Sequence, residues 1–302
     1  MQLLPCSQAK AKVACATHTL TAVAEMFAIS DSTVRRYDQA VLQEDLSAPN
    51  LDDLRVLLID EKAVRKGRRY VTFVLNGDTG ELLHMAEGKK KESLRSFFDK
   101  LTDQQRSSIE AVGIDRAGSY QTVAQEEIPN AAIVYDHFHL RLNLNEAVDE
   151  VRRQEWGKAR KKDKSFIKGS RYILLANEEN LDDKGTSKLA AIQEANENIS
   201  TAYYLKEQFR EIHTYRYRAW ALRSLMQWCD LADESGLAAF ERLSKSFRKQ
   251  AEQIVSYCKH RVTSGPIEGF NNLVSRVVHR ACGITNFDYA WLKFRQLSLK
   301  HI

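Results

Sequence analysis

Three apolar runs of the sequence end in an aspartate, a residue type that can bind a metal ion. The runs VLLID, AVGID and AIVYD end at Asp60, Asp115 and Asp136. Their length and composition predict buried β-strands. If the first and fourth strands of the sheet are parallel neighbours, their carboxyl ends lie side by side, where open α/β sheets place their sites. We therefore expect Asp60 and Asp115 to face each other at the end of the sheet.

Two carboxylates held this close repel each other unless a cation lies between them. Mg²⁺ or Mn²⁺, hard divalent ions that prefer oxygen ligands, are the natural occupants. Glu61 is not expected to share the site, because successive strand residues point to opposite faces. The alternative is that strand-end aspartates only cap the helices that follow, and the sequence leaves the two interpretations of Asp60 and Asp115 about equally open.

A third acid is expected from residues 263–283, where Ser264, Gly265 and Pro266 predict a turn before a helix. Glu268 stands in the first turn of that helix. An acid at such a position commonly interacts only with the helix dipole. The residues alone therefore give Glu268 no stronger role.

The elements that must position these acids divide the chain into regions of different character. Residues 51–139 alternate short apolar runs with turn residues and amphipathic stretches, which predicts an α/β unit with a mixed sheet and helical crossovers. Within it, residues 76–80 predict a hairpin turn. Residues 140–260 carry apolar residues at helical spacing, which predicts a large all-α region. Its aromatic residues are expected to pack between helices: Trp156, Trp220, Trp228, Tyr203 and Tyr204.

The first 50 residues predict a separate helical region. Residues 19–42 have the pattern of helix, short turn and helix, with Ala24, Ala28 and Val34 at the spacing of a helix-turn-helix. Ala28 stands where such motifs prefer glycine. From the residues alone, a plain helical hairpin is as consistent with this pattern as a DNA-binding motif.

Composition and charge narrow the class of protein. The 302 residues, 43% of them apolar, suffice for a hydrophobic core and two or three structural units. No apolar stretch approaches the roughly 20 residues that span a bilayer, so we expect a cytoplasmic protein with no membrane partner. The five cysteines are odd in number and never spaced as CxxC, which argues against a disulfide framework and a zinc site.

Positive charge is concentrated in two stretches, although the net charge is only +5. Residues 151–172 contain nine Lys or Arg against two acids, and residues 242–261 contain six against one. One such cluster alone favours a solvated helix face. Together they favour a polyanionic partner such as nucleic acid.

Several long segments, taken together, resemble the ISL-three family of bacterial insertion-sequence transposases. They include LRVLLIDEKAVRKGRRYVTFVLNGDTGELL, AVGIDRAGSY, AAIVYDHFHLRLNLNEAVDEVRRQE, SRYILLANEENL and VTSGPIEGFNNLVSRVVHRACGITNF. The resemblance implies an RNase H-like catalytic core with a DDE triad at Asp60, Asp115 and Glu268, which would hold two Mg²⁺ or Mn²⁺ ions. It also implies the order of regions: an N-terminal helix-turn-helix region (1–50), the first part of the core (51–139), a helical insertion (140–260) and the second part of the core (261–302).

The resemblance extends to residues around the triad. The segment DHFH resembles an accessory Asp-x-x-His motif, which would assign Asp136 and His139, although a core or capping role for His139 is equally open. Double-stranded DNA, both element ends and target, is the implied partner. The residues expected to contact it are Lys66, Arg68, Arg69, Arg276, Arg280, Asn271, Asn272, Arg35 and Arg36.

The implied activity is metal-dependent DNA cleavage and strand transfer by a homodimer or higher multimer associated with the bacterial nucleoid. Family members usually begin with a Cys-rich zinc ribbon, which the residues before 51 do not contain, so we expect an N-terminally shortened copy. Two alternatives remain. One is an inactive or domesticated DNA-binding remnant, and the other is a structure-selective nuclease that cuts without joining.

Overall fold

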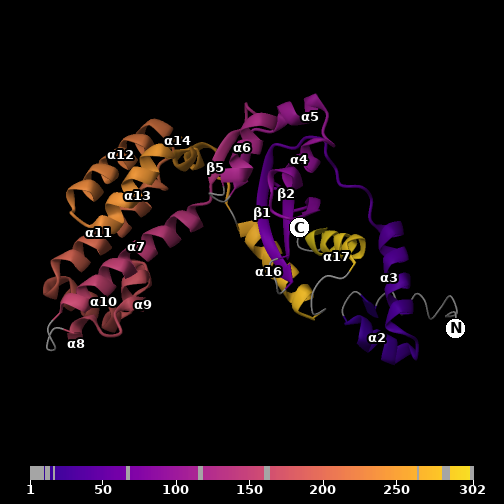
Figure 1. The fold of residues 1–302 in the computed structure, drawn as a ribbon, viewed down its shortest axis with the longest axis horizontal. Coiled ribbons are helices and arrows are strands. Elements are labelled where there is room, and N and C mark those ends of the chain that lie inside the picture. Colours follow the sequence, from indigo (N-terminus) through magenta and orange to yellow (C-terminus); the bar gives the residue numbers. More distant parts are fainter. Residues whose placement is uncertain are drawn as a thin grey trace. The chain divides into compact units, whose positions relative to one another are not determined.

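A computed structural model describes residues 10, 14–15, 18–65, 69–114, 118–159, 164–263, 265–280 and 286–299 (Figure 1). The chain forms two compact units. The first contains residues 1–112, 118–131 and 265–302, and the second contains residues 113–117 and 132–264. Within the described ranges, no helix combines the length and the apolar character that a membrane span requires.

A five-stranded sheet has the strand order β3-β2-β1-β4-β5. Its strands are β1 (Val56–Arg65), β2 (Arg69–Asn76), β3 (Leu82–Glu87), β4 (Ala111–Ile114) and β5 (Ala132–Tyr135). The first three pair antiparallel. The first residues of β1 and β4 lie together, because Arg55 O accepts hydrogen bonds from Glu110 N at 2.8 Å and Ala111 N at 3.1 Å. These two strands therefore run in the same direction, and the mixed sheet predicted from the sequence is confirmed.

The turn between β2 and β3 lies where the sequence predicts it. The side chain of Asn76 accepts hydrogen bonds from the backbone N–H groups of Asp78 and Thr79, at 2.9 and 3.2 Å. Gly77 leaves no space for a side chain, since a Cβ atom there would lie 2.5 Å from Val56 Cγ1. This glycine lets the turn approach the first residue of β1.

Helices cover the sheet in the first unit. Helix α4 (Lys91–Phe98) packs against β2, β3 and α6 (Gly118–Glu127), and α5 (Asp103–Ser108) precedes β4. Helix α16 (Gly265–Arg280) packs on β1, and α17 (Phe287–Leu299) packs on β3 and α16. The last two helices follow the second unit in sequence and return to the first, as Figure 1 shows in yellow.

Three phenylalanines anchor α16 and α17 to the sheet. The ring of Phe73 on β2 lies 5.3 Å from Phe270 on α16 and 5.9 Å from Phe294 on α17, both in edge-on geometry. All three side chains are at most 4% exposed. Buried aromatic pairs of this geometry stabilise by about 0.5–1.5 kcal/mol beyond the area that they bury. The cluster therefore fixes where α16 crosses the sheet.

The N-terminal helices are α2 (Leu20–Phe27) and α3 (Asp31–Asp45). Ala28 between them adopts the left-handed conformation, with φ of 51°, and Ser30 caps α3 by accepting a hydrogen bond from Thr33 N. Asp38 of α3 pairs with Lys293 of α17 at 3.0 Å. The two predicted helices are confirmed, whereas a DNA-binding role for them stays a prediction.

The second unit is helical after β5, as predicted. Its helices are α7 (His137–Lys158), α8 (Lys164–Ile167), α9 (Arg171–Leu175), η1 (Glu178–Asn180), α10 (Asp183–Ala195), α11 (Glu197–Ile212), α12 (Arg218–Glu234), α13 (Ala238–Lys249), α14 (Ala251–Val255) and α15 (Tyr257–His260). Trp228 packs as predicted and donates a hydrogen bond to Leu205 O at 2.7 Å. Trp220 and Tyr204 do not, because their side chains are 58% and 51% exposed.

We predict that Gly77→Ala destabilises the protein by about 1–3 kcal/mol, because the added methyl group overlaps Val56. The measurement is urea unfolding. Gly269→Ala on α16 is the matched control, since a Cβ atom there meets nothing within 4 Å, and we expect it to be neutral or stabilising by up to about 1 kcal/mol. Equal stabilities of the two variants would contradict the packing described for the turn.

Candidate functional site

Asp60 lies within β1 and not at its end. The strand continues to Arg65, and Asp60 pairs with Phe73 of β2 in the antiparallel ladder. The expectation that the strand stops at the acids was wrong, because β2 offers backbone partners to the polar residues that follow. Leu57, Leu58 and Ile59 before it are at most 2% exposed, so a strand buried on both faces leads into a half-buried carboxylate.

Both oxygens of the Asp60 carboxylate accept hydrogen bonds. Oδ1 accepts from the backbone N–H of Glu61 at 2.7 Å, and Oδ2 accepts from Asn271 Nδ2 at 2.5 Å. Asn271 is on α16, 211 residues away in the chain. These contacts fix the orientation of the carboxylate and connect the central strand to α16.

Glu61 points away from this contact, as the strand geometry predicts. Its Oε2 lies 3.5 Å from the hydroxyl of Tyr120 on α6, and its Oε1 lies 3.8 Å from Lys89 Nζ. Burial raises the pKa of Tyr120 to about 12, and the negative charges of Glu61 and Asp60 add to the rise. Tyr120 is therefore a neutral hydroxyl, held 2.7 Å from Thr72 Oγ1. No motif in the sequence marks Tyr120 as a residue near the site.

Helix α16 presents two different faces. Ile267, Phe270, Asn271 and Val274 are buried at helical spacing, whereas Glu268 is exposed. Because residues three apart are neighbours on a helix surface, Glu268 lies on the turn next to the residue that contacts Asp60. The structure thus brings together Asp60, Asn271 and the helical turn that carries Glu268.

Asn271 was expected to contact DNA, but the structure gives its side chain a different setting. It is 8% exposed and donates to Asp60. Its other amide atom, Oδ1, is buried and has no hydrogen-bond partner among the residues that the structure describes. In the sequence, the burial of Asn271 is indicated only by its position on the predicted helix, three residues after Glu268 and on the same side as Phe270.

The remaining predicted site residues are dispersed. Asp115, Lys66 and Arg68 lie outside the described residues, as do the side chains of Arg69 and Arg280. Asn272, Arg276 and Arg36 are exposed, and Arg35 is half-buried. These settings leave their expected contacts with DNA as predictions.

Asp136 and His139 belong to the second unit. Asp136 caps α7 by accepting a hydrogen bond from Phe138 N at 3.0 Å, and its Oδ2 lies 2.8 Å from His139 Nδ1. The side chain of Asp136 is 8% exposed and that of His139 is 37% exposed. For Asp136 the capping interpretation of a strand-end aspartate is therefore confirmed, and it also orients the imidazole.

Among the residues that the structure describes, no three His, Cys, Asp or Glu side chains form a group that could hold a metal ion. Asp115 is not one of these residues. The donor atoms at Asp60 nevertheless suit a hard cation, since such ions take carboxylate and carbonyl oxygens as ligands. Asn271 Oδ1, which has no partner within the described part of the chain, is such an oxygen, on the amide that contacts the carboxylate.

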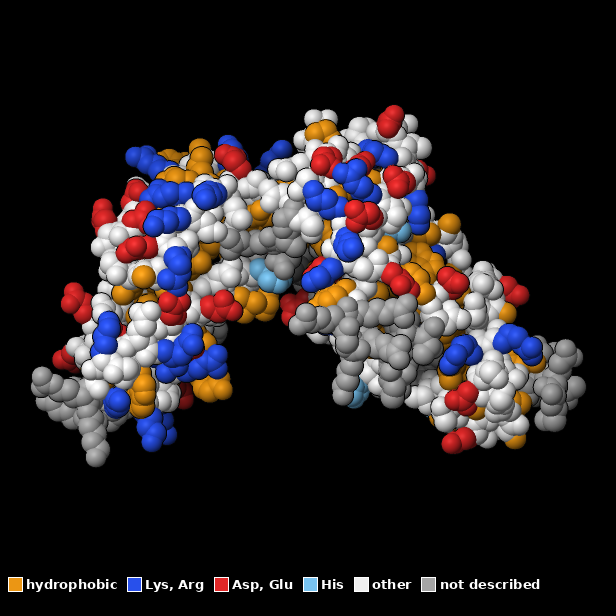
Figure 2. Space-filling model, in the orientation of Figure 1, with side chains coloured by type: hydrophobic (Ala, Val, Ile, Leu, Met, Phe, Trp, Pro, Cys, Tyr) orange, Lys and Arg blue, Asp and Glu red, His pale blue; other side chains and the backbone are white. Residues whose placement is uncertain are grey.

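Basic side chains lie over both units and are mixed with acids on the face shown in Figure 2, where Lys and Arg gather over the region of α9. Of the nine bases in residues 151–172, Arg160, Lys161 and Lys162 lie outside the described residues. The other six lie on or beside α7, α8 and α9. The positive stretch seen in the sequence is therefore a surface of the second unit.

Comparisons with known proteins place the chain among transposases. The family model DDE_Tnp_ISL3, described as "Transposase", matches residues 57–294. The transposase for insertion sequence element IS1001 of Bordetella parapertussis is 31% identical over 91% of this chain and 68% of its own length. The transposase for insertion sequence element IS1557 of Mycobacterium tuberculosis is 28% identical over 87% of this chain and 64% of its own length. The chain thus spans about two thirds of the length of these relatives.

Proposed function

Because the chain belongs to the ISL3 family of DDE transposases, we propose that it cleaves and joins DNA strands in the transposition of an insertion sequence. Its substrates would be the ends of the element and the target, both double-stranded DNA. Asp60, Asp115 and Glu268 would be the catalytic acids. Transposition joins two element ends to one target, so we propose that a homodimer or higher multimer assembles on DNA.

The observation that carries the proposal is the contact between Asp60 on β1 and Asn271 on α16. It links the two segments in which the family resemblance locates the first and the last acid. Asn271 follows Glu268 by three residues, so the turn that carries Glu268 lies at the strand that carries Asp60. The packing of Phe270 against Phe73 holds α16 on the sheet and supports the same arrangement.

The sequence and the position of β4 both support Asp115 as the second catalytic acid. This strand begins beside β1 and runs in the same direction. Asp115 follows Ala111 by the same number of residues as Asp60 follows Val56. Equal spacing from neighbouring strand starts supports the assignment of Asp115 as the second acid.

Asp60, Asp115 and Glu268 would hold two Mg²⁺ or Mn²⁺ ions, with Asn271 orienting Asp60. When bound, such ions lower the pKa of an attacking water and stabilise the leaving oxygen. Water attack on a phosphodiester breaks the P–O3′ bond and leaves a 3′-hydroxyl. That hydroxyl then attacks a target phosphodiester, and the displaced O3′ takes up the proton. No serine or tyrosine nucleophile is required, because neither step forms a covalent bond between enzyme and DNA.

The hydrogen bonds to Asp60 prepare this chemistry in the absence of substrate. Both carboxylate oxygens already accept from N–H donors, so little side-chain freedom remains to be lost on assembly of the site. Exposed basic and amide groups on α16, Arg276 and Asn272, would contact phosphates beside it. We further propose Asp136 and His139 as accessory groups, with Asp136 holding the imidazole.

We predict that Asp115→Asn and Glu268→Gln each abolish Mn²⁺-dependent DNA cleavage and leave DNA binding intact, because each removes a charge that holds metal but no group that contacts phosphate. Cleavage is measured on labelled DNA and binding by fluorescence anisotropy. Asp78→Asn in the β2–β3 turn is the control and should cleave normally. Cleavage near the parent level would remove the substituted acid from the site, and binding without cleavage in the parent would indicate a DNA-holding remnant.

We predict that Asn271→Ala weakens Mn²⁺ binding about 10–100-fold, the usual effect of losing a group that orients a metal ligand. The readout is the free Mn²⁺ signal in electron paramagnetic resonance, which does not depend on activity. Asn272→Ala is the matched control, since the neighbouring amide is exposed and should leave the affinity unchanged. Equal affinities of the two variants would show that Asn271 does not act on Asp60 in metal binding.

A further inference from the structure

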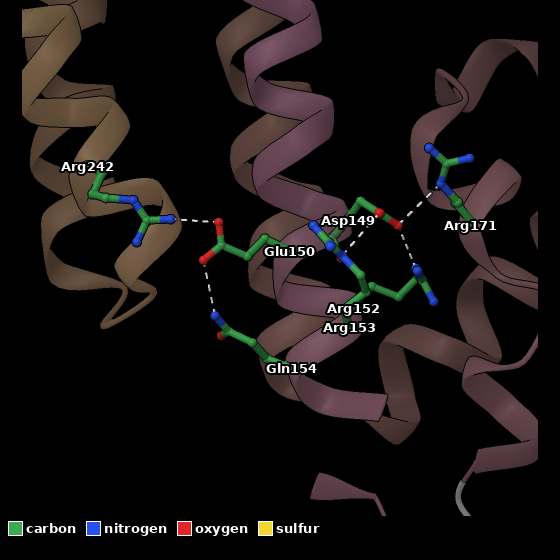
Figure 3. A network of polar contacts seen from close by, with 7 residues as sticks. All are labelled: Asp149, Glu150, Arg152, Arg153, Gln154, Arg171 and Arg242. Carbon is green, nitrogen blue, oxygen red and sulfur yellow. Dashed lines mark hydrogen bonds and ion pairs between the residues drawn. The ribbon is translucent and has the colours of Figure 1, made fainter. Parts of the chain in front are cut away.

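One carboxylate of the second unit gathers three arginines. Asp149 on α7 lies 2.8 Å from Arg152 Nε. It also lies 3.4 Å from Nε of Arg153, on the next turn of the same helix, and 3.4 Å from Nε of Arg171 on α9. Figure 3 shows these side chains converging on Asp149. We call these four residues the Asp149 cluster.

All three arginines use the same atom for this contact. Each approaches Asp149 through Nε, and among the described residues the terminal Nη atoms of the three form no hydrogen bond or ion pair. In Figure 3 the terminal nitrogens of Arg171 extend away from Asp149. The cluster therefore holds the guanidinium groups in place while their terminal Nη donors stay available.

Charge and exposure point to an external anion. Asp149 is 16% exposed, whereas Arg153 and Arg171 are 67% and 52% exposed. Three positive charges face one negative charge, so the cluster has an excess of two. An arginine that offers two parallel N–H groups matches the oxygens of a phosphate. A carboxylate that restrains these long side chains also reduces the entropy lost on binding.

The neighbouring Arg242 shows the opposite arrangement. It reaches Glu150, on the other side of α7 from Asp149 (Figure 3), through its terminal Nη2 at 2.6 Å. Arg248 likewise uses Nη2, at 2.7 Å from Asp230 and 2.9 Å from Asp233. In these arginines, a terminal Nη group is paired with an acid of the protein itself. The availability of the Nη atoms thus distinguishes the Asp149 cluster from Arg242 and Arg248.

We propose that the Asp149 cluster is a preformed site for backbone phosphates of duplex DNA. The inference rests on the proposed function, in which DNA is the substrate. It assigns to the helical unit a DNA contact that does not involve the catalytic acids. Arg153 and Arg171 would bind phosphate through their Nη atoms, and Arg152 would add charge beneath them. Such contacts position DNA without reading its sequence.

The test is the salt dependence of duplex DNA binding by the full chain, without added metal. Each phosphate contact contributes about 0.9 to the slope of log affinity against log salt. We expect Arg153→Gln with Arg171→Gln to lower the slope by about two. The matched control, Arg242→Gln with Arg248→Gln, removes the same charge from the same unit, and its slope should fall by less than about one.

Two further variants keep the test decisive. Arg153→Gln alone, at the most exposed of the three arginines, should lower the slope by about one even if the double variant folds poorly. Arg153→Lys with Arg171→Lys keeps both charges and should retain most of the slope. The proposed site would be overturned if the double Gln variant at Arg153 and Arg171 and its control had equal slopes. It would also be overturned if the double Lys variant lost as much slope as the double Gln variant.

The failure of this inference and the failure of the proposed function give different results. If the parent protein binds duplex DNA with a steep salt dependence and the Gln pair does not change it, only the Asp149 cluster is excluded. If the parent protein shows no salt-dependent binding, DNA itself is excluded as the partner and both fall. Mn²⁺-dependent cleavage by the parent, measured separately, reports on the catalytic acids alone.

Discussion

The packing of α16 on β1 is the constraint on which the candidate site depends. The two elements come from opposite ends of the chain, with the whole helical unit between them in sequence. The edge-on contact of Phe73 with Phe270 sets the position of the helix. The hydrogen bond from Asn271 to Asp60 then joins its polar side to the strand. The buried amide of Asn271 and the half-buried carboxylate of Asp60 both lose hydration on folding. The hydrogen bond between them offsets part of that free-energy cost.

The same packing separates adjacent acids into different roles. Asp60 meets α16, whereas Glu61 meets Tyr120 and Lys89. The alternation of side chains along a strand suffices to predict this divergence. The sequence could not show that β1 continues past the acids, because the cause is backbone pairing with β2, which local composition does not reveal. Nor could it show that Asn271 meets Asp60, since the partner lies 211 residues away and an amide in a helix has many possible settings.

Charge is used differently in the two units. In the first, the buried Arg295 pairs with Glu81 at 2.7 Å and is 3% exposed, so it serves the packing of α17 on the sheet. In the second, many bases lie at the surface, and several of those described pair with acids. The sequence counts of Lys and Arg predict a positive region, but which guanidinium groups keep their terminal donors available is decided by the fold. Figure 3 shows both outcomes around α7, which carries the acidic partners Asp149 and Glu150.

The most direct test of the central claim, that Asp60 is the catalytic acid of β1, compares it with its neighbour. DNA spanning both flanks of the gene is incubated with purified protein and Mn²⁺, using the parent, Asp60→Asn and Glu61→Gln. The two substitutions remove one charge each from adjacent residues without changing side-chain size. We expect cleavage at the element ends by the parent and by Glu61→Gln, and none by Asp60→Asn. Cleavage retained by Asp60→Asn, or lost in both variants alike, would contradict the account.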